Sequence, residues 1–138
     1  MPIEIPKDKW TGAVKSITLG ATAADGGTRS SVVTVGGEKA LPFMHFEAEM
    51  PHKPVVAIEI KDRKPDDWSA LLLDVWGDAM NDPAAWAKAA EAAGAELLQL
   101  TLSLTVADGS PNTPAAAVAA VKAVLAASGL PLIVFGPG

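Results

Sequence analysis

The stretch Gly36–Ile60, GGEKALPFMHFEAEMPHKPVVAIEI, contains the patterns of two different kinds of β-strand. Apolar and polar residues alternate through Ala40–Met50, which is typical of a strand with one face exposed to water. Val55–Ile60 is an almost unbroken apolar run, which favours a parallel strand covered on both faces. The sequence therefore predicts a lead-in strand, a turn at the two prolines between these runs, and a buried parallel strand.

Two shorter strands are predicted before this stretch. Trp10–Leu19 and Ser31–Val35 contain β-branched residues and flank a loop of glycine and small polar residues, so they predict a β-hairpin. The loop Gly26–Ser30 has two interpretations, a plain hairpin loop or an anion or partner contact through its amides and Arg29. It lacks the lysine and the following helix of a P-loop, and this favours the plain loop.

A helix and a strand are predicted after the buried strand. Pro65–Met80 is interpreted as a short helix or a covered loop. Asp82 can cap a first helical turn and Pro83 suits its first position, so a helix is predicted from there to about Ala93. In Glu96–Leu104 leucines line one face and polarity grows toward the carboxyl end of the other. This pattern is typical of a barrel strand whose inner face becomes polar near the mouth.

A second helix and a third buried strand complete the series. Thr113 and Pro114 predict a helix start in the same way, and Ser128 with Gly129 predicts its end. Leu132–Phe135 is a short apolar run that predicts a strand. The order from Val55 onward is strand, helix, strand, helix, strand, and such crossovers place their strands parallel. The sequence therefore predicts an α/β fold.

The length of the chain limits which α/β architecture it can form. A (β/α)8 barrel takes about 250 residues, whereas this chain has 138 residues and ends after its third predicted parallel strand. We therefore expect the N-terminal part of a TIM barrel, truncated after that strand and preceded by a β-hairpin; a small open α/β domain is the alternative. The expected domains are 1–50, the hairpin with its lead-in strand, and 51–138, the first βαβαβ units.

Composition excludes several classes of function. The net charge of −5 argues against nucleic acid or an anionic membrane as a partner. The chain contains no cysteine, so we expect any iron–sulfur cluster to belong to a partner and not to this chain. No basic start with an apolar core and no apolar run of about 20 residues is present, so we expect a cytoplasmic protein.

Polar residues at the carboxyl ends of the predicted strands are the best candidates for a binding site, because open α/β sheets and barrels bind ligands at this edge. Glu59 and Asp62 lie at the end of the first parallel strand, and Thr101, Ser103 and Asp108 at or after the end of the second. The alternative for each is a helix cap, a surface ion pair or a loop hydrogen bond. No catalytic residue and no metal ligand is predicted.

Three tryptophans have a structural and a functional interpretation. Trp68, Trp76 and Trp86 could form a stacking surface for a ligand, but their spacing is helical, and this favours packing in the core.

Three segments of the sequence carry a resemblance to a known family. They are GGTRSSVVTVGGEKALPFMHFEAEMPHKPVVAIEI, GDAMNDPAAWAKAAEAAGAELLQLTL and the closing PLIVFG. In this order the chain, from about Trp10 to Gly136, resembles the small subunit of the corrinoid iron–sulfur protein and the delta subunit of the acetyl-CoA decarbonylase/synthase complex. The resemblance implies a hairpin capping a TIM barrel whose mouth faces a cobalamin shared with a larger subunit, which carries the cluster.

The function that the resemblance implies is methyl transfer in the reductive acetyl-CoA pathway of carbon fixation. Cobalt would carry the methyl group from a methylated tetrahydropterin to acetyl-CoA synthase, so the expected partners are the larger corrinoid iron–sulfur subunit, a methyltransferase and acetyl-CoA synthase. The chain would then be a heterodimer subunit without catalysis of its own. His45 and His52 lack the Asp-x-His-x-x-Gly pattern of another cobalamin-binding fold. A pterin-dependent methyltransferase barrel and a purely structural module remain as alternatives.

Overall fold

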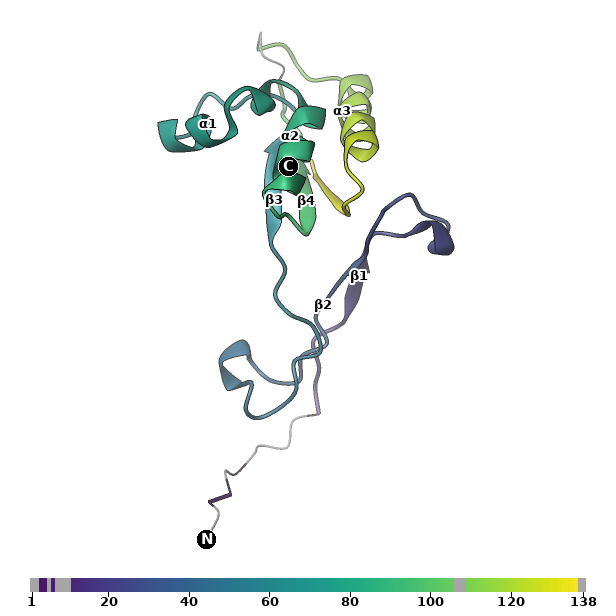
Figure 1. The fold of residues 1–138 in the computed structure, drawn as a ribbon, viewed down its shortest axis with the longest axis vertical. Helices are drawn as coiled ribbons and strands as arrows, with labels where there is room; N and C mark the ends of the chain where they lie inside the picture. Colours follow the sequence, from purple (N-terminus) through teal and green to yellow (C-terminus); the bar gives the residue numbers. More distant parts are fainter. Residues whose placement is uncertain (1–2, 5, 7–10, 106–108, 137–138) are drawn as a thin grey trace. The chain divides into compact units, whose positions relative to one another are not determined.

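The computed structural model describes residues 3–4, 6, 11–105 and 109–136 (Figure 1). Within these residues the strands are β1 (Ile17–Leu19), β2 (Val33–Val35), β3 (Ala57–Lys61), β4 (Leu97–Thr101) and β5 (Leu132–Phe135). The α-helices are α1 (Ala70–Trp76), α2 (Pro83–Ala92) and α3 (Pro114–Ala127), and the short 3-10 helices are η1 (Ala23–Asp25), η2 (Pro42–Met44) and η3 (Gly77–Asn81). The chain divides into two compact units, 1–18 with 34–55 and 19–33 with 56–138. We call them the hairpin unit and the sheet unit.

The sheet unit contains a three-stranded parallel sheet in the order β3-β4-β5. Ile58 pairs with Leu98 and Leu98 with Leu132, so these side chains share one face. The predicted succession of parallel strands separated by helices is confirmed, and β5 has its predicted bounds. The chain is therefore an α/β protein.

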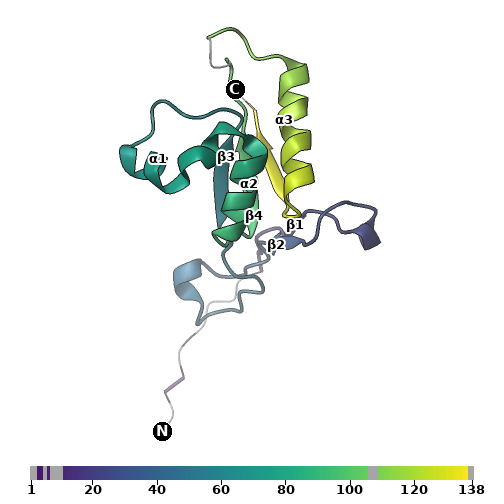
Figure 2. The same cartoon turned by 45° about the horizontal axis from the view of Figure 1, so that its top comes forward.

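The core of the sheet unit lies between this face of the sheet and the helices. Ile60, Leu98 and Leu100 are fully buried there, together with Trp86 of α2 and Val124 of α3. Helix α2 contacts both β3 and α3, and the two helices run beside each other in Figures 1 and 2. The prediction that β3 is covered on both faces is wrong for the described residues, because Ala57 and Glu59 on its other face are exposed.

Both predicted helix starts are confirmed. The Asp82 carboxylate accepts hydrogen bonds from the backbone N–H groups of Ala84 and Ala85, both at 3.2 Å. Thr113 Oγ1 accepts one from the N–H of Ala116 at 3.2 Å. These bonds satisfy donors of the first turn that have no partner within the helix. Local sequence therefore positions α2 and α3 on the sheet.

The loop before β2 is attached to the end of α3 within the sheet unit. The Arg29 guanidinium donates to the carbonyl oxygens of Leu125 at 2.9 Å and Ser128 at 2.7 Å, with a longer contact of 3.4 Å to Leu130. The N–H of Ser30 donates to the carbonyl of Gly129 at 2.8 Å. A cation at these carbonyls satisfies acceptors that the helix leaves free. This arrangement supports the plain loop over an anion contact.

The hairpin unit differs from its prediction. β1 and β2 form the expected two-stranded sheet, but each is three residues long, and Trp10 lies outside the described residues. The predicted strand over 40–50 is wrong. The chain there forms η2, with the N–H of Met44 donating to Leu41 at 2.7 Å and that of Glu47 donating to Met44 at 2.8 Å. These local bonds occupy the backbone groups that a strand would offer to a neighbour.

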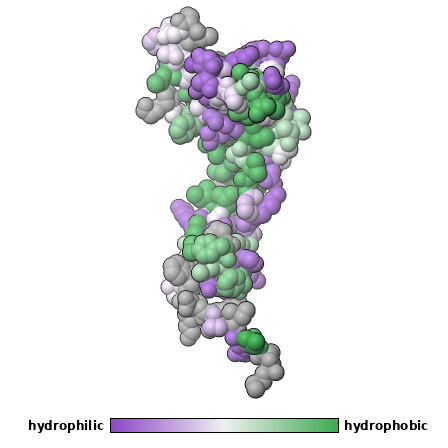
Figure 3. Space-filling view, turned by 90° about the vertical axis from the view of Figure 1, so that its left-hand side faces the viewer, coloured by the Kyte–Doolittle hydropathy of each residue, from purple (hydrophilic) through white to green (hydrophobic). Residues whose placement is uncertain are grey.

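The helices show two further features. No helix in the described part of the chain is long and apolar enough to cross a bilayer. Figure 3 faces the side of α1, where the sheet unit exposes hydrophobic surface beside hydrophilic surface. Leu71, Leu72 and Val75 of α1 are exposed apolar residues of this unit.

Candidate functional site

The carboxyl ends of β3 and β4 meet at one edge of the parallel sheet. Lys61 pairs with Thr101 and Glu59 with Gln99, so the last residues of the two strands are neighbours. Thr101 and Glu59 lie on the face opposite the helices, because the fully buried Ile60 and Leu100 point the other way. The structure thus places the predicted polar residues of the two strands at a common edge.

A polar row crosses this exposed face. Thr101 Oγ1 donates to Glu59 Oε1 at 2.8 Å, and Gln99 Nε2 reaches Thr101 Oγ1 at 3.5 Å. Glu59 is exposed, and its Oε2 accepts no hydrogen bond from the described residues. Thr101 therefore bonds to one oxygen of the carboxylate, and the other is left as an acceptor without a partner among the described residues.

A second and denser set of hydrogen bonds lies just beyond the strands, and we call Asp62, Ser103 and Asn112 the clasp. Asp62 Oδ1 accepts from Ser103 Oγ at 2.6 Å, and Asp62 Oδ2 accepts from the Ser103 N–H at 2.9 Å and from Asn112 Nδ2 at 2.9 Å. Asn112 Nδ2 also donates to the Ser103 carbonyl at 3.0 Å. These bonds are partly buried, so bulk water competes with them weakly.

The clasp includes a residue that sequence reasoning missed. Asn112 stands directly before the helix-capping Thr113, and its Oδ1 accepts from the Thr113 N–H at 2.8 Å. Asparagine before a helix start is a signal for such a local bond. Its bond to Asp62 joins residues 50 positions apart and has no local signal.

The structure brings four of the five predicted residues together as two pairs. Glu59 pairs with Thr101, and Asp62 with Ser103. Asp108 lies outside the described residues. Whether these side chains bind a ligand stays a prediction, since hydrogen bonds within the protein are also the alternative expected for each of them.

The described residues at this edge offer groups that can form hydrogen bonds. Among the described residues no three His, Cys, Asp or Glu side chains are grouped so as to hold a metal ion. The edge offers carboxylate oxygens, hydroxyls and a carboxamide, and these suit amide or hydroxyl groups of a ligand. The Lys61 Nζ lies 5.2 Å from the ring centroid of Trp68, which places its charge over an aromatic face.

The tryptophans form part of the core behind this edge. Trp86 is fully buried and meets Trp68 edge-on at 5.5 Å between ring centroids, while Trp76 lies at 6.2 Å. The prediction that they pack in the core is confirmed, because Trp68 and Trp76 both contact the buried cluster. Trp86 Nε1 is buried and has no hydrogen-bond partner among the described residues.

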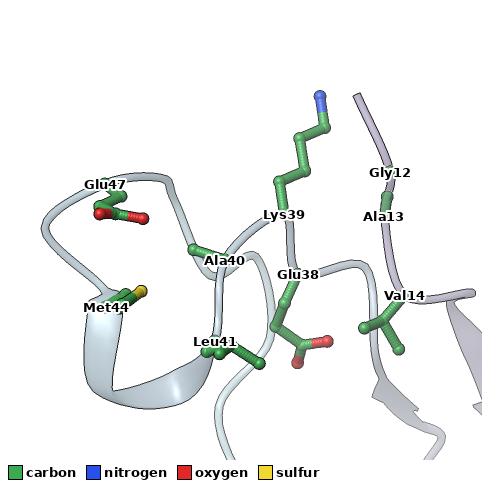
Figure 4. Close-up of a pocket in the computed structure, with 9 residues that line it drawn as sticks. All are labelled: Gly12, Ala13, Val14, Glu38, Lys39, Ala40, Leu41, Met44 and Glu47. Atoms are coloured by element: carbon green, nitrogen blue, oxygen red, sulfur yellow. The ribbon is translucent and has the colours of Figure 1, made fainter. Parts of the chain in front are cut away.

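The hairpin unit has a pocket of about 450 Å³ (Figure 4). Its lining is mainly apolar, with Val14, Leu41 and Met44 around it, and it also includes the carboxylates of Glu38 and Glu47. None of the predicted site residues lines this pocket. In Figure 4 the Lys39 side chain extends away from the other labelled side chains.

The fold is that of an α/β chain with hydrogen-bonded polar residues at one edge of its parallel sheet. Comparison with known proteins identifies the family of the chain. Residues 16–137 match the family model described as CO dehydrogenase/acetyl-CoA synthase delta subunit, and the chain belongs to this family. The family predicted from the sequence is thereby confirmed.

Individual relatives are similar along nearly the whole chain. The acetyl-CoA decarbonylase/synthase complex subunit delta of Archaeoglobus fulgidus is 40% identical over 135 residues, which are 96% of this chain and 29% of the relative. Subunit delta 1 of Methanosarcina thermophila is 36% identical over 94% of this chain and 30% of its own. Subunit delta 2 of Methanosarcina acetivorans is 34% identical with the same coverage. The chain thus spans less than a third of the length of these relatives.

Proposed function

We propose that the chain is part of a corrinoid-protein subunit that takes part in methyl transfer from a methylated tetrahydropterin to acetyl-CoA synthase. Membership of the delta-subunit family supports a place in the acetyl-CoA pathway. The polar row at the sheet edge, where Thr101 donates a hydrogen bond to the exposed Glu59, is the observation that carries the site proposal. The proposed setting is cytoplasmic, and the proposed partner is the larger corrinoid iron–sulfur subunit.

The side chains at this edge fit the periphery of a corrinoid. A corrin ring carries carboxamide substituents, and the acceptor oxygen of Glu59 suits their N–H groups. The Thr101 hydroxyl donates its hydrogen to Glu59, so it could bind a substituent only as an acceptor. Cobalt would need a ligand of another kind, and the two histidines of the chain, His45 and His52, belong to the hairpin unit. The proposed role of Glu59 and Thr101 is to orient the ring rather than to ligate the metal.

The roles proposed for the corrinoid and for the protein follow from general cofactor chemistry. When bound, a corrinoid supplies the cobalt that accepts and releases the methyl group, whereas the protein supplies position and exclusion of water. Glu59 would hold one ring substituent, Thr101 would keep the carboxylate in the binding orientation, and Gln99 would support Thr101. No side chain of this edge needs to act as a nucleophile.

The relation to a barrel is part of the same proposal. Three parallel strands with helices on one face would be the first βαβαβ units of a TIM barrel, and relatives about three times as long have chain enough to complete one. The division into 1–50 and 51–138 stays a prediction within this proposal. The exposed face carrying Glu59 would then turn toward the barrel interior and its mouth.

A titration with hydroxocobalamin tests the function. The chain is mixed with the larger corrinoid subunit, and the corrin absorption spectrum is recorded with and without this chain. We expect a band shift that requires both proteins. Glu59→Gln should weaken binding about tenfold or more, because a hydrogen bond to a charged group contributes about 1.5–3 kcal/mol. Glu91→Gln, a change on the exposed surface of α2, is the matched control and should bind as the wild type.

Three results would contradict the proposal in different ways. Equal affinity of the Glu59→Gln and wild-type proteins would show that Glu59 does not contact the corrinoid. Turnover of a methylated pterin by the chain alone would indicate a methyltransferase. A spectrum unchanged by the chain at any ratio of the two proteins would leave a purely structural role.

A further inference from the structure

The clasp stands beside the proposed corrinoid contacts without being free to make one itself. Asp62 accepts three hydrogen bonds from described residues, and both of its oxygens are used. Ser103 donates its backbone N–H and its hydroxyl to that carboxylate. A ligand would have to break these partly buried bonds before it could bind there, which is costly. Glu59, in contrast, is exposed, and one of its oxygens accepts no hydrogen bond from the described residues.

The clasp instead determines where Thr101 lies. The Asp62 N–H donates to the Thr101 carbonyl at 3.2 Å, and the Asp62 carboxylate accepts from the N–H of Ser103, two residues beyond the end of β4. The two bonds of Asp62 therefore lie on either side of the Thr101–Ser103 segment and hold the Thr101 backbone at the end of the strand. The Thr101 hydroxyl in turn orients Glu59.

Asn112, at the start of α3, stabilises Asp62 and Ser103 in this arrangement. Its Nδ2 group donates to Asp62 Oδ2 and to the Ser103 carbonyl, while its Oδ1 accepts from the Thr113 N–H. The amide thus bonds to the ends of both strands and to the helix, and the Asp62 carboxylate is not free to rotate. Neither a carboxylate nor a short hydroxyl could replace Asn112, because two donors and one acceptor are required.

We propose that Asp62 and Asn112 are positioning residues, which act through Thr101 to orient the Glu59 carboxylate toward the ligand. The inference rests on the proposed function and sharpens it. Of the four described residues that the sequence predicted as contacts, Glu59 and Thr101 touch the ligand, while Asp62 and Ser103 hold them in place. The supporting shell of a binding site often decides its affinity in this way.

Hydroxocobalamin titration of the complex with the larger subunit tests the inference. Asn112→Ala should raise the dissociation constant about tenfold, as is typical for loss of a supporting partner. Thr113→Ala is the matched control, because it removes the cap bond to Ala116 at the same helix end and leaves the backbone N–H that binds Asn112. It should unfold at a lower temperature, as Asn112→Ala should, yet keep wild-type affinity. A merely structural role of Asn112 predicts equal affinity for the two variants and overturns the inference.

Asn112→Asp gives a second measurement. It keeps the size of the side chain and the acceptor for the Thr113 N–H, but it replaces both donors with carboxylate oxygens facing Asp62 and the Ser103 carbonyl, so it should bind about tenfold more weakly. Wild-type affinity of Asn112→Asp would overturn the inference.

Failure of the inference and failure of the proposed function give different results. If the wild-type complex binds hydroxocobalamin and Glu59→Gln weakens it while Asn112→Ala does not, only the positioning role is wrong. If the wild-type chain causes no shift in the corrin spectrum, the proposed function is wrong and the inference falls with it.

Discussion

The two units of the chain differ in how their backbone hydrogen bonds and apolar side chains are satisfied. In the sheet unit the parallel ladder joins β3, β4 and β5, and Ile60, Leu98 and Trp86 are completely buried. In the hairpin unit none of the residues whose side chains are described is buried, and η2 uses bonds between residues three positions apart. The sheet unit is held together by long-range packing, whereas the hairpin unit relies on local bonds and short strands.

This difference predicts where stability resides. Apolar burial is the main favourable contribution to folding, so the sheet unit should dominate the free energy of unfolding. The hairpin unit contributes little buried area of its own, and its exposed Leu41, Phe43 and Phe46 cannot offset the entropy cost of ordering their loop by burial. Substitutions in the two units should therefore have very different costs.

Truncation of Trp86 should produce the largest effect. Its side chain is 0% exposed, and Trp86→Ala should lower the free energy of unfolding by about 3–5 kcal/mol because it leaves a large cavity. Phe43→Ala is the matched change in the hairpin unit, where the ring is 68% exposed, and should cost under about 0.5 kcal/mol. Urea unfolding measures both. Similar costs for the two variants would show that the hairpin unit is as well packed as the sheet unit.

Removal of the Arg29 guanidinium should produce an intermediate effect. Arg29→Ala leaves the carbonyls of Leu125 and Ser128 without their donor, and should cost about 1.5–3 kcal/mol because the lost bonds involve a charged group. Amide hydrogen exchange in α3 should accelerate, as the helix end frays. Arg63→Ala removes a surface ion pair with Asp66, at 3.7 Å, and should change stability by under about 0.5 kcal/mol. If the two arginine variants unfold alike, the loop is not anchored through Arg29.

The elements that could be predicted from the sequence have causes within a few residues. Asp82 followed by Pro83, and Thr113 followed by Pro114, specify two helix starts through bonds to the next turn. The leucines of β4 alternate in a strand that really has neighbours on both sides. Local propensity and long-range pairing agree in the sheet unit, and prediction succeeds there.

The wrong and missed features depend on partners that the sequence does not reveal. Alternation through 40–50 satisfies the strand pattern, but no described strand pairs with it, and Pro42 at the first position of η2 favours a helical turn. Asp62 could be predicted at the sheet edge, yet its bond to Asn112 depends on how α3 returns to the sheet. Pattern reasoning finds the edge of a sheet more easily than the bonds across it.

The hydroxyl pair of the hairpin should produce the smallest effect and gives the finest measure of the difference between the units. Thr18 Oγ1 and Thr34 Oγ1 lie 3.0 Å apart on exposed strands. In a double-mutant cycle Thr18→Ala and Thr34→Ala should show a coupling of about 0.2–1 kcal/mol, the range of cross-strand pairs. Thr18→Ser keeps the hydroxyl and should keep the coupling. A coupling of zero would mean that this pair does not form in solution, and a coupling above that range would mean that the hairpin unit is held more firmly than its exposed side chains indicate.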